Sequence, residues 1–137
     1  MPSANEPQRS ERDRRVASRI ATKYGLYECD ACAADIIKKL GRGASAWALR
    51  IRPVDGSLFI GLARTESLVS NNRSHIGVQV DDWVFDNLHP EGVPAVEWPG
   101  RFITRSGALL VVERRPIADF FGAKFRRERF RDWVYRD

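Results

Sequence analysis

Residues 74–87 read SHIGVQVDDWVFDN, and this stretch decides the fold. Two short runs rich in Val, Ile, Phe and Trp flank a pair of aspartates, which predicts a β-hairpin. A turn of even length centred between Asp81 and Asp82 places Val80 opposite Trp83 and Val78 opposite Phe85. Since side chains alternate across a strand, one face of the hairpin is wholly apolar and is expected in the core. Its members are Ile76, Val78, Val80, Trp83 and Phe85.

The opposite face of the hairpin carries the polar side chains. His75 and Asp86 are diagonal neighbours there, roughly 7–8 Å apart between backbones, which is within reach of an imidazole–carboxylate hydrogen bond. Gly77 lies across from Asp86 and leaves room for another group to approach. Gln79 shares this face, where it either binds substrate or is solvated. The hairpin therefore predicts a general base with the carboxylate that orients it, but without a nucleophile.

Neighbouring polar residues fit this site less well. Asn87 follows Asp86 but falls on the apolar face by parity, so it is not expected to orient the base. His89 lies in a proline-containing loop, predicted over residues 87–94, and is expected at the surface.

Length and composition place the chain among single globular domains. It has 137 residues, of which 43% are hydrophobic and 30% charged, which suits one domain with a modest core. No apolar run is long enough for a membrane span, and the polar N-terminus does not resemble a secretory signal. The two cysteines are only three residues apart, which favours free thiols with a chemical role over a structural disulfide.

Charge is distributed unevenly along the chain. The formal net charge is +2 over residues 1–28, −2 over residues 29–100 and +5 over residues 101–137. A basic C-terminal segment with aromatic residues raises a second hypothesis, a non-catalytic module that binds nucleic acid. Its candidate contacts are Arg126, Arg127, Arg129, Arg131, Phe125, Phe130 and Trp133.

The remaining patterns predict helices around a mostly antiparallel sheet, an α+β fold. Residues 1–9 are expected to form a disordered tail, followed by one domain over residues 10–137. Helices are predicted at 10–24, over about twelve residues within 26–41, and at 117–135, with a short turn at 94–98. Strands are predicted at 46–52 and 58–63 around a turn, and at 101–105 and 108–115 as a last hairpin. In the first of these strands Trp47, Leu49 and Ile51 are expected inward, and Ala48 and Arg50 outward.

The nucleophile is expected at the start of the second helix, in the segment CDACA (residues 29–33). A thiol at a helix N-terminus feels the positive end of the helix dipole, which favours the reactive thiolate. Both Cys29 and Cys32 occupy such a position. A residue order of Cys, His and Asp, with Cys opening a helix and His on a strand, is the arrangement of papain-like cysteine enzymes.

The sequence also resembles a narrower group, the papain-fold toxin domains of bacterial polymorphic toxin systems. The resemblance lies in CDACA opening a helix, in SNNRSH (residues 70–75), in VFDNLHPEGV (residues 84–93) and in a downstream Trp98. It extends from about residue 24 to residue 98, and residues 101–137 are an elaboration outside it. It implies a papain-like fold and an active site of Cys, His75 and Asp86. It also implies an effector delivered into the cytoplasm of another cell, a protein substrate there and a cognate immunity protein as partner.

Two considerations bear on which cysteine is the nucleophile. Papain-like helices tend to have a small residue one turn after the nucleophile, which favours Cys29 because Ala33 follows it, whereas Ile36 follows Cys32. Papain itself, however, begins this helix with two cysteines of which the second is the nucleophile. Both assignments therefore stay open at the level of sequence.

The expected chemistry is a thioester route that needs no cofactor and no metal. His75 takes the thiol proton, the thiolate attacks a carbonyl carbon, and water resolves the thioester. Peptide cleavage, glutamine deamidation and transamidation share this intermediate, and the sequence does not choose among them. A third hypothesis is a zinc site formed by Cys29, Cys32, His75 and His89.

Overall fold

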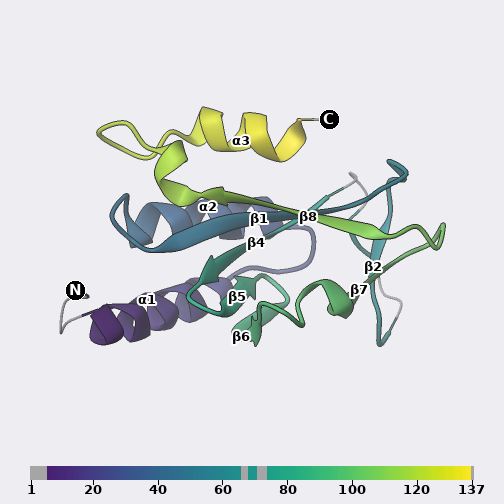
Figure 1. The fold of residues 1–137 in the computed structure, drawn as a ribbon, viewed down its shortest axis with the longest axis horizontal. Coiled ribbons are helices and arrows are strands. Elements are labelled where there is room, and N and C mark those ends of the chain that lie inside the picture. Colours follow the sequence, from purple (N-terminus) through teal and green to yellow (C-terminus); the bar gives the residue numbers. More distant parts are fainter. Residues whose placement is uncertain (1–5, 66–67, 71–73, 137) are drawn as a thin grey trace.

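The computed structural model describes residues 6–65, 68–70 and 74–136 and has the predicted α+β architecture (Figure 1). The α-helices are α1 (Glu6–Ala21), α2 (Cys29–Leu40) and α3 (Arg127–Tyr135), and the 3-10 helices are η1 (Pro99–Arg101) and η2 (Ile117–Phe120). The strands are β1 (Ala46–Pro53), β2 (Ile60–Leu62), β3 (Leu68–Ser70), β4 (His75–Val80), β5 (Trp83–Asp86), β6 (His89–Pro94), β7 (Phe102–Thr104) and β8 (Leu110–Pro116). No helix in the described ranges is long and apolar enough to span a membrane.

The predicted central hairpin is present as β4 and β5, with the expected register. Val78 pairs with Phe85, Gln79 with Val84, and Val80 with Trp83. The hairpin lies inside an antiparallel five-stranded sheet of order β6-β5-β4-β1-β8. A smaller sheet of order β3-β2-β7 lies at one end of the molecule (Figure 1).

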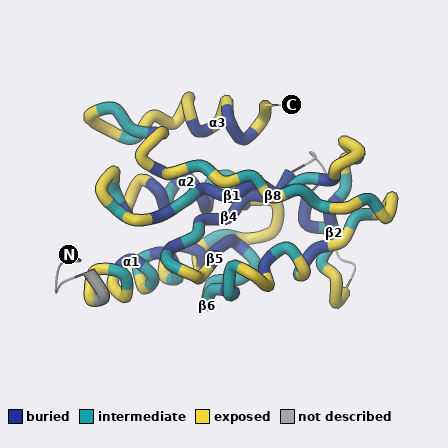
Figure 2. The backbone as a smooth tube through the Cα atoms, viewed as in Figure 1, coloured by how far each residue is buried: buried dark blue, intermediate teal, exposed yellow. Residues whose placement is uncertain are grey.

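The main sheet is buried on both faces, so the fold has two cores rather than one (Figure 2). On one face Ile76, Val78, Val80 and Phe85 pack with buried residues of α1, α2, η2 and α3. On the other face Leu49, Ile51 and Val84 pack with Trp98, Phe102 and the small sheet. Trp83, which was expected in the core, lies at its margin with 36% of its surface exposed. Because both faces are covered, apolar side chains such as those of Leu49, Ile51 and Val84 are buried on the face opposite the helices as well.

Because both faces of β1 are buried, the prediction for this strand was wrong in part. Ala48 and Arg50, expected outward, are 0% and 3% exposed because the helical layer covers their face. The Arg50 guanidinium donates to backbone carbonyls at the end of α3, among them those of Trp133 and Val134, and it also pairs with Glu113. A buried charge of this kind is tolerated because both terminal nitrogens of the guanidinium have acceptors, although Nε has no partner among the described residues.

Two predicted hairpins do not form. The segment at 58–63 was expected to pair back on 46–52, but β2 pairs with β3 and β7 in the small sheet, and β1 pairs with β4 and β8. Likewise, β7 and β8 flank the turn at Ser106-Gly107 but belong to different sheets. Residues 89–94, expected within a loop, form β6 and pair with β5. The pairings of β1 with β8 and of β2 with β7 are long-range, so local patterns do not determine them, whereas β5 and β6 form a local hairpin.

Helix boundaries differ from the prediction at both ends of the chain. Helix α1 begins at Glu6, so residues 6–9 are helical rather than disordered. Pro7 does not prevent this, since proline is tolerated in the first turn of a helix. The predicted helix at 117–135 is divided into η2 and α3 by an extended turn in which Phe121 bridges to Phe125. The extended backbone at Phe121 ends the first segment, next to Gly122.

Candidate active site

Helix α2 presents both cysteines at its first turn, as the sequence predicted. Asp30 in the first turn and Lys38 and Lys39 in the last complement the helix dipole. Cys29, the first residue of the helix, is 7% exposed, whereas Cys32 is 0% exposed. Burial raises the pKa of Cys32 to about 12, so Cys32 is a neutral thiol at physiological pH. Of the two cysteines, Cys32 is the one that behaves as a small buried hydrophobe.

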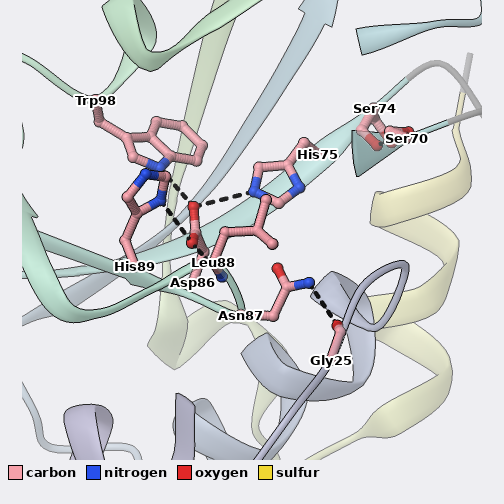
Figure 3. A network of polar contacts seen from close by, with 9 residues as sticks. All are labelled: Gly25, Ser70, Ser74, His75, Asp86, Asn87, Leu88, His89 and Trp98. Carbon is pink, nitrogen blue, oxygen red and sulfur yellow. Dashed lines mark hydrogen bonds and ion pairs between the residues drawn. The ribbon is translucent and has the colours of Figure 1, made fainter. Parts of the chain in front are cut away.

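His75 and Asp86 form the hydrogen bond that the hairpin geometry predicted (Figure 3). The distance from His75 Nε2 to Asp86 Oδ2 is 3.0 Å, and neither side chain is exposed to solvent. The two residues come from adjacent antiparallel strands, β4 and β5, which hold their backbones in a fixed register. A buried carboxylate and imidazole in contact are each stabilised in the charged form.

From the residues that the structure describes, Asp86 accepts four hydrogen bonds, two on each oxygen. Trp98 Nε1 donates to Oδ2 at 2.8 Å, beside His75. His89 Nδ1 and the backbone N–H of Leu88 donate to Oδ1 at 2.9 and 2.8 Å. Burial alone would raise the pKa of Asp86, but the two imidazoles hold it well below its usual range. Asp86 is therefore an ionised, fully saturated acceptor in the interior of the protein.

The ionised carboxylate fixes the tautomer of His75. An ionised Asp86 can only accept, so Nε2 of His75 carries a hydrogen and Nδ1 of the neutral ring is free to take a proton. Nδ1 has no nitrogen or oxygen partner among the described residues. Burial disfavours the imidazolium, but hydrogen bonding and charge from Asp86 and Cys29 outweigh burial and raise the pKa of His75 to about 10. His75 thus has a hydrogen bond to Asp86, and Cys29 contributes to the raised pKa of its ring.

Trp98 and His89 contact Asp86, a placement that the sequence did not predict. Trp98 is fully buried, and its ring centroid lies 6.0 Å from that of His75. It occupies the space beside Gly77 that was expected to admit another group, because an added Cβ at Gly77 would lie 3.0 Å from Trp98 Cζ2. His89 was expected at the surface, but its side chain is only 16% exposed and it contacts Asp86 (Figure 3). The spacing Asp86-x-x-His89 was the available signal for the second contact.

The structure does not bring Gln79 to this site. Gln79 lies four residues along β4 from His75, and its amide donates to the backbone carbonyl of Asp81 at 2.7 Å. Its contact therefore belongs to the hairpin turn. Asn87 points away from Asp86 and donates to the carbonyl of Gly25 at 2.8 Å, which ties the end of β5 to the segment before α2 (Figure 3).

The zinc hypothesis loses its ligand set, and the nucleic-acid hypothesis loses two of its three aromatic contacts while its four arginines stay exposed. Among the described residues, no three or more His, Cys, Asp or Glu side chains are grouped so that they could hold a metal ion. In the basic C-terminal segment, Phe130 and Trp133 are 1% and 6% exposed and pack in the core, so they are not available to stack on bases.

The profile of the family described as Papain fold toxin 2 matches residues 13–102. The chain belongs to this family. The match covers 90 of 137 residues and includes all four elements of the site, α2, β4, β5 and the turn with Trp98. No curated protein and no solved structure matches the chain.

As a papain fold toxin domain, the chain extends past the matched region by β8, η2 and α3. Strand β8 lengthens the sheet next to β1, and α3 adds Phe130, Trp133 and Val134 to the helical core. The extension, at the top and right of Figure 1, is thus part of the same folded body.

Proposed function

We propose that this toxin domain is a cysteine-dependent amide hydrolase in which Cys29 is the nucleophile, His75 the general base and Asp86 the orienting carboxylate. The observation that supports it most is the hydrogen bond from His75 Nε2 to Asp86, which leaves Nδ1 as the proton acceptor while Cys29 acts on the same ring. Cys29 is preferred over Cys32 because Cys32 is fully buried and its pKa is raised to about 12.

The proposed reaction has two steps. The thiol proton of Cys29 goes to Nδ1 of His75, and the raised pKa of His75 favours the resulting thiolate–imidazolium pair, whose thiolate attacks the substrate carbonyl carbon. The C–N bond breaks, the amine leaves with the proton from the imidazolium, and a thioester remains on Cys29. Water, deprotonated by His75, then attacks the thioester and releases the acid and the free thiol. With a peptide bond as substrate this is proteolysis, and with a glutamine side chain it is deamidation.

The family also suggests where such a reaction acts. We propose a protein substrate in the cytoplasm of a target cell, and a cognate immunity protein that protects the producing cell. Hydrolysis of an essential protein is sufficient to make the domain toxic.

Single substitutions of the two cysteines test the proposal. Cys29→Ala is expected to lower the rate of amide hydrolysis by at least about a thousandfold. It should also lower the growth inhibition that the wild-type domain causes when it is expressed in bacteria. Cys32→Ala removes only a buried thiol and is expected to keep the rate within a few fold. Circular dichroism of both variants controls for folding. The proposal is wrong if both variants stay fully active, and the assignment of the nucleophile is reversed if only Cys32→Ala is inactive.

A further inference from the structure

A cavity of about 330 Å³ lies on the helical face of the main sheet and is lined by three arginines, Arg50, Arg52 and Arg136. Its other walls come from the ends of β1 and β8, from the residue before β4 and from the end of α3. They include Val111, Ser74 and Tyr135. This volume suits a group the size of one or two side chains.

The cavity adjoins the elements that carry the proposed nucleophile and base. Ser74 directly precedes His75, the first residue of β4. Tyr135 donates its hydroxyl hydrogen to Asp30 Oδ2 at 2.6 Å, and Asp30 directly follows Cys29. The pKa of Tyr135 is raised to about 12, first by this hydrogen bond, and the charge of Cys29 contributes. A group bound in the cavity would therefore lie next to the start of α2.

The positive charge of the cavity is only partly neutralised. Arg50 and Arg52 share one carboxylate, that of Glu113, at 2.8 and 2.6 Å. Arg136 makes no ion pair with any residue that the structure describes. Three guanidinium groups against one carboxylate leave a formal charge of +2.

The three arginines differ in what they do for the fold. Arg50 is 3% exposed and holds the end of α3 through the carbonyls of Val134 and Arg136, at 3.2 and 2.9 Å. Arg52 is 42% exposed at its side chain and pairs with Glu113 alone. Arg52 and Arg136 are thus the two that can turn toward an incoming anion, while Arg50 supplies fixed charge beneath them.

We propose that this cavity binds a carboxylate of the substrate, so that the domain acts on acidic protein segments, with an aspartate or glutamate side chain held by Arg52 and Arg136 near the scissile amide. The inference rests on the proposed function for its link to catalysis. Guanidinium groups match carboxylates in geometry and bind them in two-pronged contacts. Four of the ten residues that line this cavity, Arg136 among them, lie outside the family match, so the proposed preference depends in part on the C-terminal extension of this chain.

The binding test uses succinate as the carboxylate probe and succinamide as its neutral analogue. Binding is followed by the NMR chemical shifts of the full chain. Succinate is expected to shift the resonances of Ser74 and Tyr135, and succinamide is not. The double variant R52Q/R136Q is expected to weaken succinate binding on the order of fivefold for each guanidinium removed. Added salt should weaken binding to the wild type in the same direction.

Arg42→Gln is the matched control. Arg42 is exposed just past the C-terminal end of α2, opposite the end that carries Cys29. Its substitution should therefore leave succinate binding unchanged. The inference is overturned if succinate binds no better than succinamide, or if R52Q/R136Q binds it as well as the wild type does. Failure of the proposed function is seen separately, because Cys29→Ala would then retain hydrolysis while succinate binding is intact.

Discussion

At the scale of single residues, Asp86 is the centre of the site. Its two oxygens accept hydrogen bonds from four residues, which lie on β4, on β6 and in two separate turns. This saturation explains how a carboxylate that is 1% exposed stays ionised. It also explains why the imidazole of His75 has only one orientation available.

Replacing Asp86 by Asn tests this role. An amide at this position can present its N–H to His75 Nε2, which would favour the tautomer with the hydrogen on Nδ1. We expect kcat to fall by about a hundredfold to ten-thousandfold, and the raised pKa of His75 to return toward its usual range. Kinetics and NMR titration of the imidazole measure the two effects. An unchanged pH profile in Asp86→Asn would contradict the assigned role.

At the scale of elements, the β4–β5 hairpin is unusual because both of its faces are buried. One face packs on the helices, and the other packs on Trp98 and Phe102. Gly77 makes the second packing possible, since Trp98 lies where a side chain at Gly77 would be. Because Gly77 has no side chain, the space next to it is filled by the indole of Trp98 and not by a ligand.

Gly77→Ala is expected to destabilise the protein by about 1–3 kcal/mol through overpacking. The new Cβ would lie 2.9 Å from Val84 Cγ1 and 3.0 Å from Trp98 Cζ2. Displacing the indole should also lengthen its hydrogen bond to Asp86 and lower activity. Urea denaturation measures the loss of stability. Gly100→Ala is the control, because its Cβ would meet no atom within 4 Å, and equal stability of the two variants would refute the packing argument.

At the scale of the whole molecule, the buried charges make stability depend on pH. The pKa of His75 is raised from 6.5 to about 10 in the folded protein. Between these values the folded state holds a proton that the unfolded state releases, so the free energy of unfolding should fall as pH rises, by up to about 1.4 kcal/mol per pH unit. Asp86, whose pKa is lowered, should make stability fall again below pH 3.8.

Urea titrations from pH 6.5 to pH 8 measure the slope due to His75. The upper limit avoids the range in which Cys32 would add a slope of the same sign, because its pKa rises from 9.0 to about 12 on folding. The Cys32→Ala variant removes that contribution altogether. A free energy of unfolding that is constant over this range would show that folding takes up no net proton at the site.

Much of the site could be predicted from local sequence. The alternation in residues 74–87 determined the register of β4 and β5, and register alone brings His75 and Asp86 to one face. The helix that opens at Cys29 followed from its own apolar spacing and its end charges. These features are local because helices and tight hairpins connect residues that are near in sequence.

Tertiary structure alone decided what surrounds those elements. The pairing of β1 with β8, the covering of Arg50 by α3 and the contact of Trp98 with Asp86 join segments that are far apart in the chain. Tertiary structure also distinguished Cys29 from Cys32. Both thiols lie at the start of the same helix, but neighbouring elements bury Cys32 more deeply than Cys29. Periodicity reports which side chains share a face, whereas burial depends on which other segment packs on that face.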